Sequence, residues 1–290
     1  MHGRRQLNSF LSIGDLLVEV TGPGAELVPE DLRPFVAEPN RPIDFTCQSR
    51  PGPVAAVDDE DLLFDSGGVW KFGRSDDGFR LVLHAEGRPY HALELNAELD
   101  RAVAVLDSEF LPAEETRFPL RAPIHELWTS FLLMRGRGLL LHACGWLVDD
   151  RVHIFAGQSG AGKSTLAGVL NKSGRGQILS DDRLILRPTG RGGFRVFGTP
   201  WHGELQHALP RSGKVASIDF LAKAKEPKRN PMGKALAAAR LTSVCFLAGW
   251  PRRDLAQVLD TCAQVVAAVP MAELAFAPDQ SVMRVLDDEN

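Results

Sequence analysis

The chain has 290 residues, of which 44% are apolar and 24% charged, and its formal net charge is −4. This length allows one large domain or two ordinary ones, and the composition is that of a globular protein rather than a disordered chain. No long basic block is present, which argues against sequence-independent binding of nucleic acids. The first ten residues lack the apolar core of a signal peptide, and no apolar run approaches the ~20 residues that span a bilayer. We therefore expect a cytoplasmic protein without nucleic-acid or membrane partners.

The cysteines are far apart in the sequence, with no CxxC pair and no histidine at metal-ligand spacing. A zinc site or a disulfide framework is therefore not expected. Cys144 and Cys245 lie in apolar stretches and are interpreted as small core residues. The four thiols, which we expect to be reduced, are Cys47, Cys144, Cys245 and Cys262.

The first part of the chain favours short strands. A loosely alternating run over 11–20 ends at Gly22-Pro23-Gly24, 30–37 suits a short helix, and 42–48 predicts another strand. The acidic stretch 54–65 predicts a connection. Turn residues then separate four runs, which predict an antiparallel meander at 69–73, 79–85, 90–95 and 102–106. We expect a small β-rich α+β domain over residues 1–120, which we interpret as an aid to substrate binding.

The pattern changes at Pro119. Apolar residues at helical spacing from Ile124 to Met134 predict a helix that connects two units over 121–137. The segment 223–234, KAKEPKRNPMGK, is the most basic and is predicted to be a loop. Further strands are predicted at 139–141, 145–148, 152–156 and 272–276, and further helices at 258–266 and 281–286.

A phosphate-binding motif begins directly after the strand predicted at 152–156. Residues 157–165 read GQSGAGKST and match the P-loop (Walker A) pattern G-x-x-x-x-G-K-[ST]. Glycines let backbone amides approach a phosphate, and the helix that follows adds positive partial charge at its N-terminus. Lys163 is expected to reach the β- and γ-phosphates, and the Ser164 hydroxyl to ligate Mg²⁺. The predicted nucleotide-binding residues are Gly157, Gln158, Ser159, Gly160, Ala161, Gly162, Lys163, Ser164 and Thr165.

Two adjacent carboxylates follow the next predicted strand. Asp181 and Asp182 interrupt an apolar stretch over 178–186, at the distance from the P-loop where the following strand is expected. In a P-loop protein, carboxylates at a strand end hold Mg²⁺ or accept a proton. We interpret them as functional, although an Asp-Asp pair elsewhere is usually only a turn.

These residues resemble the HPr kinase/phosphorylase family and its HPr-kinase-related members. The resemblance rests on His142-Ala143, the loop GQSGAGKS and the segment SDDRLIL, and it covers roughly residues 138–290. It implies an α/β fold with a P-loop kinase core related to phosphoenolpyruvate carboxykinase, and homo-oligomers. It also implies that Asp181 is the catalytic base, that Asp182 helps to hold Mg²⁺, and that His142 lies beside the phosphates.

The sequence also departs from that family. Thr165 stands where the bona fide enzymes have a glutamate, and 197–204 replaces their glycine-rich segment. Glu204 is a candidate further ligand of Mg²⁺ or a surface carboxylate. The chain looks closer to the HPr-kinase-related proteins of peptide modification, including lasso-peptide kinases. The basic residues considered for phosphate contact, none of them favoured over a solvated surface position, are Arg211, Lys214, Lys228 and Arg229.

The sequence therefore predicts an ATP- and Mg²⁺-dependent kinase. Its expected acceptor is a serine hydroxyl of a protein or precursor peptide. Three alternatives remain open at this point. They are a small-molecule kinase, a genuine HPr kinase/phosphorylase, and a slow ATPase switch or nucleotide-binding module.

Overall fold

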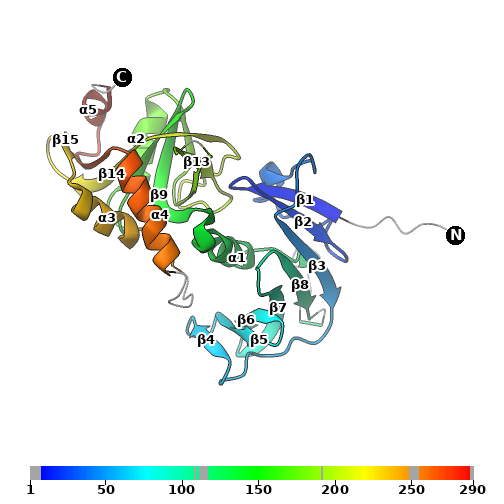
Figure 1. Ribbon diagram of the computed structural model, residues 1–290. Coiled ribbons are helices and arrows are strands. Elements are labelled where there is room, and N and C mark those ends of the chain that lie inside the picture. The colour runs from blue at the N-terminus through cyan, green and yellow to red at the C-terminus, as the bar shows by residue number, and fades with distance from the viewer. Residues whose placement is uncertain (1–7, 108, 111–116, 191, 248–254, 288–290) are drawn as a thin grey trace. The chain divides into compact units, whose positions relative to one another are not determined.

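The computed structural model describes residues 8–107, 109–110, 117–190, 192–247 and 255–287. The chain divides into two compact units, residues 1–132 with 248–252 and residues 133–247 with 253–290. The division falls within the segment 121–137 that the sequence marks as a connection. The protein is a mixed α/β structure with a large sheet in each unit and few helices (Figure 1).

The first unit is built on one eight-stranded sheet, with the strand order β1-β2-β3-β8-β7-β6-β5-β4. The meander predicted for β5 to β8 is confirmed, since each of these strands pairs antiparallel with the next. In contrast, β3 pairs in parallel with both β2 and β8. The strands are β1 (Asn8–Ile13), β2 (Leu16–Thr21), β3 (Phe45–Pro51), β4 (Leu62–Asp65), β5 (Trp70–Ser75), β6 (Gly78–Ala85), β7 (Arg88–Asn96) and β8 (Arg101–Leu106).

Three predictions for this unit need correction. The run 11–20 is not one strand, because Gly14 and Asp15 both take a φ of 60° and turn the chain into the β1–β2 hairpin. The helix predicted at 30–37 is a single 3₁₀ turn, Arg33–Phe35. The connection predicted at 54–65 ends in β4, which pairs antiparallel with β5 and so completes the sheet edge.

The larger core of the first unit lies between the sheet and α1 (Ile124–Leu132), and a smaller buried cluster of Val57, Val82, Ala92 and Val105 lies on the other face of the sheet. The rings of Trp128 and Phe45 lie 4.0 Å apart, and those of Phe131 and Phe72 lie 4.6 Å apart. Trp128 is fully buried, and its indole Nε1 donates a hydrogen bond of 3.2 Å to the carbonyl oxygen of Leu99. Aromatic side chains of one short helix therefore close one face of the sheet.

The helical segment ends near Gly136, as predicted. After Leu132 the chain makes one wider helical turn over Leu133–Arg137, where Arg135 and Gly136 leave helical φ and ψ values. Gly136 has a φ of 78°, which costs little for glycine and ends the helix.

The second unit is built on a mixed sheet. Its path runs β10-β9-β12-β13-β14-β16-β15, with β11 beside β9. Because β10 also pairs in parallel with β14, the pairing of β9, β12, β13, β14 and β10 runs round a closed circuit. The strands are β9 (Leu139–Val148), β10 (Arg151–Ala156), β11 (Gln177–Ser180), β12 (Arg183–Pro188), β13 (Phe194–Gly198), β14 (Ser212–Lys223), β15 (Lys228–Pro231) and β16 (Met271–Phe276).

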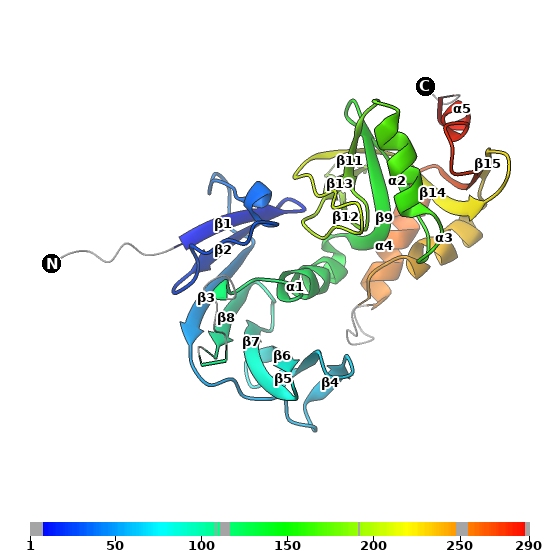
Figure 2. The same ribbon diagram turned by 180° about the vertical axis from the view of Figure 1, so that it is seen from behind.

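Helices cover both faces of this sheet. Helix α2 (Lys163–Lys172) and helix α5 (Val282–Asp287) bury apolar side chains in one cluster with the strands. Helix α4 (Leu255–Ala268) lies on the opposite face from α2, and α3 (Lys234–Ser243) packs against α4 (Figures 1 and 2). Within the described residues, no helix is both long and apolar enough to cross a membrane.

The elements predicted at 258–266, 272–276 and 281–286 are confirmed as α4, β16 and α5. The two strands predicted at 139–141 and 145–148 are instead one continuous strand, β9, because it pairs along its length with β12, β10 and β11. The loop predicted over 223–234 contains β15, which the antiparallel edge of β16 holds in place.

The buried indole of Trp128 gives a test of the first unit. We expect Trp128→Ala to lower the free energy of unfolding of this unit by about 3–5 kcal/mol, because it leaves a large cavity. The matched control is Val69→Ala, since Val69 is 59% exposed and its truncation should cost less than ~0.5 kcal/mol. Urea titration with intrinsic fluorescence and circular dichroism measures both. Equal effects of the two changes would mean that α1 does not anchor the sheet.

Candidate active site

The loop over 157–162 joins β10 to α2 and depends on its glycines. Gly160 and Gly162 have φ values of 79° and 104°, a region that side-chain-bearing residues rarely adopt. A Cβ on Gly162 would lie 3.1 Å from the ring of Phe276, and one on Gly157 would lie 2.7 Å from the Cβ of Ala161. The backbone therefore takes a path that these residues alone permit.

The loop ends at the uncapped N-terminus of α2. Gly162 is the N-cap residue and offers no side chain to the first turn. Its carbonyl oxygen accepts a hydrogen bond of 2.8 Å from the amide of Leu166, which starts the helix. The amides of Lys163, Ser164 and Thr165 belong to the first turn, where the helix dipole favours an anion. This arrangement is a physical basis for phosphate binding.

The ammonium group of Lys163 is folded back over this loop. The side chain is only 7% exposed, and Nζ donates to the carbonyl oxygens of Gly157 at 2.8 Å and Gln158 at 3.3 Å. Its third short contact is with Nε2 of His142, at 2.9 Å. Burial lowers the pKa of this ammonium group, and the nearby carboxylate of Asp182 opposes that shift.

The imidazole of His142 links this lysine to a carboxylate. An ammonium group can only donate, so Nε2 of His142 accepts a hydrogen bond from Lys163. On the other side of the ring, Nδ1 lies 3.0 Å from Oδ1 of Asp182. Lys163, His142 and Asp182 therefore form one hydrogen-bonded chain. In the sequence, His142 lies 21 positions before Lys163 and 40 positions before Asp182.

Arg183 is a further member of this cluster that the sequence analysis did not single out. Its Nη1 lies 2.5 Å from Oδ2 of Asp182 and 2.6 Å from Nδ1 of His142, and its guanidinium group lies 5.3 Å from the centre of the Phe246 ring. The one signal in the sequence was its position directly after the carboxylate pair.

Asp182 is therefore held as a carboxylate. Partial burial by itself would raise its pKa, but the hydrogen bond from His142 and the charges of Arg183 and Lys163 outweigh burial and lower it. The side chain keeps 26% of its exposure, so it remains accessible to a ligand.

Asp181 points to a different neighbourhood. It is only 2% exposed, and its two carboxylate oxygens accept backbone hydrogen bonds from Gly203 at 3.0 Å and Leu205 at 2.8 Å. A Cβ on Gly203 would lie 2.8 Å from Asp181 Oδ2, so the close approach depends on glycine. The backbone amides of the segment 203–205 thus anchor Asp181. Glu204 lies in the same segment, and its side chain is exposed.

A pocket of about 480 Å³ adjoins the loop. One wall is formed by 156–161, and the other by β14 and α3 through Phe220, Leu221 and Arg240. Nη2 of Arg240 forms an ion pair of 2.8 Å with Glu273. The pocket places a cation opposite the loop amides, in a volume that suits a small ligand.

The four basic residues considered for phosphate contact lie elsewhere or are already engaged. Arg229 forms an ion pair of 2.5 Å with the fully buried Asp219, which also accepts a hydrogen bond from Ser217. Arg211 donates a hydrogen bond to Gln177, and Lys214 and Lys228 are exposed on strands. Arg229 therefore has a structural role in holding β15 to β14.

The oxygen donors near the loop suit a hard cation. Mg²⁺ binds through one or two carboxylates or hydroxyls and keeps several waters, so a few such donors suffice. The half-buried hydroxyl of Ser164, at the first turn of α2, and the partly exposed carboxylate of Asp182 are donors of that kind. In the described part of the chain, no group of three or more His, Cys, Asp or Glu side chains is placed to hold a metal ion.

Comparison with known proteins gives likenesses in structure but not in sequence. No protein-family model matches the sequence, and neither does any curated protein. Among solved structures, the HPr(Ser) kinase/phosphatase from Coxiella burnetii aligns with 52% of this chain and 99% of its own, at 13% sequence identity and a TM-score of 0.29. At these values neither fold, reaction nor substrate is transferred from that protein to this chain.

The lowered pKa of Asp182 predicts a pH dependence of stability. The carboxylate stabilises the second unit fully above the pKa of an unfolded aspartate, about 3.9, and this contribution disappears as the pH falls through the lower pKa of the folded state. We expect Asp182→Asn to lower the free energy of unfolding by roughly 1–3 kcal/mol at pH 7, because Arg183 and His142 lose a charged partner. The difference from wild type should shrink below about pH 4.

Denaturant titrations between pH 3 and 7 measure this effect. The control is Asp149→Asn, since Asp149 is exposed and lies in the same unit. A wild-type advantage over Asp182→Asn that stays constant down to pH 3 would contradict the assigned pKa.

Proposed function

We propose that the second unit is an ATP- and Mg²⁺-dependent kinase core that transfers the γ-phosphate to a hydroxyl group. The acceptor in this proposal is a serine of a protein or precursor peptide. The supporting observation is the hydrogen-bonded chain from Lys163 through His142 to Asp182. Its lysine is the first residue of α2, directly after the glycine loop. Such a chain joins a phosphate-binding cation to a carboxylate, which simple anion binding does not require.

The chain's own groups define how the nucleotide is held. The loop amides and the N-terminus of α2 bind phosphate oxygens, and Lys163 neutralises charge on the β- and γ-phosphates. The three hydrogens of its ammonium group currently face Gly157, Gln158 and His142. To donate to a phosphate oxygen, Lys163 must therefore release at least one of these acceptors. A bound Mg²⁺, held by Ser164 and Asp182, supplies further charge neutralisation.

The transfer itself needs positioning and one proton acceptor. The acceptor oxygen forms a bond to the γ-phosphorus, while the bond from that phosphorus to the β,γ-bridging oxygen breaks and ADP leaves. We assign the hydroxyl proton to Asp181. Each oxygen of Asp181 accepts one backbone hydrogen bond from the 203–205 segment and keeps a second lone pair that can take the proton.

Lys163→Ala tests nucleotide binding. We expect it to weaken ATP binding at least tenfold and to abolish phosphate transfer, because the loop loses its only buried ammonium group among the described residues. The control is Lys172→Ala, at the exposed C-terminal end of the same helix, which should change neither. Binding is measured with a fluorescent ATP analogue. Transfer at the wild-type rate by Lys163→Ala would contradict the proposal.

Two isosteric changes separate the roles of the carboxylates. Asp181→Asn should keep ATP binding within about twofold and lower turnover at least 100-fold, since general base catalysis contributes about 10²–10⁴. Asp182→Asn should instead raise the Mg²⁺ concentration needed for half-maximal activity. If Asp181→Asn impairs binding and turnover equally, Asp181 is not the base.

Transfer of labelled γ-phosphate into a lysate of the native host identifies the acceptor class. Label in a discrete polypeptide, absent with Lys163→Ala and Asp181→Asn, supports the proposal, and label in added HPr protein indicates an HPr kinase. Label in a small soluble product indicates a metabolite kinase instead. Release of free phosphate alone indicates a slow ATPase switch.

A further inference from the structure

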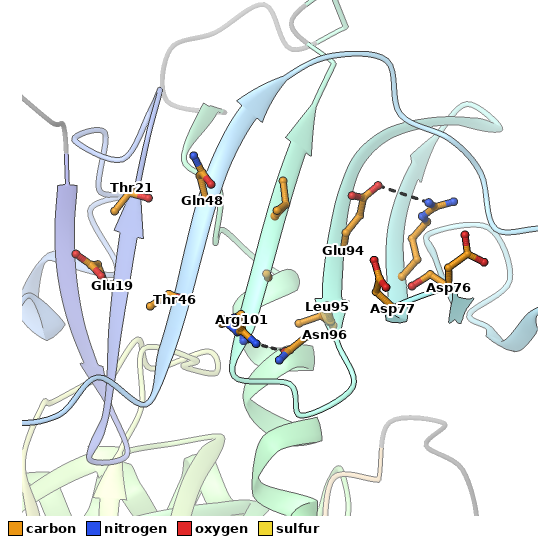
Figure 3. Close-up of a pocket in the computed structure, with 14 residues that line it drawn as sticks. Glu19, Thr21, Thr46, Gln48, Asp76, Asp77, Glu94, Leu95, Asn96 and Arg101 are labelled. Atoms are coloured by element: carbon orange, nitrogen blue, oxygen red, sulfur yellow. Dashed lines mark hydrogen bonds and ion pairs between the residues drawn. The ribbon is translucent and has the colours of Figure 1, made fainter. Parts of the chain in front are cut away.

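The first unit carries a groove on the sheet face opposite α1. Side chains alternate along β2, where Val18 and Val20 are buried and Glu19 and Thr21 face outward. On the outward face lies a groove of about 540 Å³ (Figure 3). The groove residues used below are Glu19, Thr21, Thr46, Gln48, Asp76, Asp77, Arg80, Glu94, Asn96 and Arg101.

The floor of the groove runs across adjacent strands. Glu19 pairs in register with Thr46, and Thr46 pairs with Arg101. One step along the strands, Thr21 pairs with Gln48. The lining extends over β2, β3, β8, β7 and the start of β6, which is four inter-strand steps or about 19 Å.

The wall formed by the β5–β6 turn is fixed in place. A Cβ on Gly78 would lie 2.3 Å from the carbonyl oxygen of Leu95, so this turn is pressed against the end of β7. The amide oxygen of Asn96 accepts hydrogen bonds from the backbone of Asp100 and Arg101, which secures the β7–β8 turn. The groove is therefore shaped by backbone contacts rather than by loose surface side chains.

The charge of the groove is not balanced. Glu94 forms ion pairs with Arg80 at 3.5 Å and Arg50 at 3.8 Å, and Arg101 lies 3.6 Å from Asp100. Three other carboxylates form no hydrogen bond or ion pair through their side chains with the described residues. They are Glu19 at one end of the groove and Asp76 and Asp77 at the other (Figure 3).

Between these ends lie groups that suit a peptide backbone. The hydroxyls of Thr21 and Thr46 and the amide of Gln48 line the floor and can each donate and accept a hydrogen bond. A span of about 19 Å is the length of five or six extended residues. Carboxylates at both ends, separated by such a floor, fit an extended chain with cationic side chains better than a single small cation.

We propose that this groove docks an extended basic segment of the polypeptide substrate, with Lys or Arg side chains beside Glu19 and beside Asp76 and Asp77. Docking in the groove stands on the first unit alone. The statement that the bound segment belongs to the phosphorylated substrate rests on the proposed function.

Peptide binding tests the docking. The probe is a fluorescein-labelled ten-residue peptide of alternating Lys and Ser, titrated with the full chain at low salt and without nucleotide. A Gly-Ser peptide and a Glu-Ser peptide of equal length are the comparison probes. We expect the Lys-Ser peptide to bind at least tenfold more tightly than either, and added salt to weaken it, because the contacts are exposed ion pairs.

A matched pair of variants locates the binding. E19Q/D76N/D77N removes the three unpaired carboxylates and should lower the affinity for the Lys-Ser peptide at least tenfold. D58N/D59N/E60Q makes the same change of charge at exposed positions of the same unit outside the groove. It should lower the affinity for the Lys-Ser peptide less than twofold. Equal effects of the two variants, or equal binding of the three peptides by wild type, would overturn the docking site.

Phosphate transfer separates this inference from the proposed function. Both triple variants should bind the fluorescent ATP analogue as wild type does. With a Ser-containing basic peptide, E19Q/D76N/D77N should raise KM at least fivefold and leave kcat within twofold. Groove-dependent binding without any transfer would keep the docking site and reject its role for a kinase substrate. Transfer with an unchanged KM would reject that role while the kinase stands.

Discussion

The second unit depends on the placement of one buried cation. The Lys163 ammonium group needs acceptors, because burial disfavours its charge. Two of its acceptors are carbonyl oxygens of its own loop, and the third is a ring nitrogen on β9. This requirement ties the loop to the sheet through His142, whose other ring nitrogen lies 3.0 Å from a carboxylate oxygen of Asp182.

The same constraint explains why two adjacent carboxylates have different surroundings. Asp181 and Asp182 lie in the bend between β11 and β12, so their side chains diverge. Asp182 turns toward the cations of Arg183 and Lys163, and its pKa falls. Asp181 turns toward the amides of Gly203 and Leu205 and is buried there. Two identical side chains thereby acquire different electrostatic surroundings.

The sheet of the first unit has two unlike faces. Its inner face is closed by Trp128 and Phe131 of α1, while its outer face is polar and hollowed in one part and apolar and buried in another. Alternation along the strands serves both faces at once. Parallel pairing of β3 with β2 and β8 brings residues from the two ends of this unit side by side on the outer face.

Local patterns in the sequence determined the glycine loop, the flanking strand and helix, the bend at Asp181 and Asp182, the meander and the C-terminal elements. Each depends on neighbours within a few residues, such as glycines with positive φ or apolar residues at a regular period. Only the tertiary structure decided the contacts of His142 with Lys163 and Arg183, the anchoring of Asp181 by 203–205, and the burial of Arg229 beside Asp219. It also decided that β9 is continuous and that β15 is a strand. These features depend on pairing between distant segments, and a single sequence contains no periodic or local signal of such pairing.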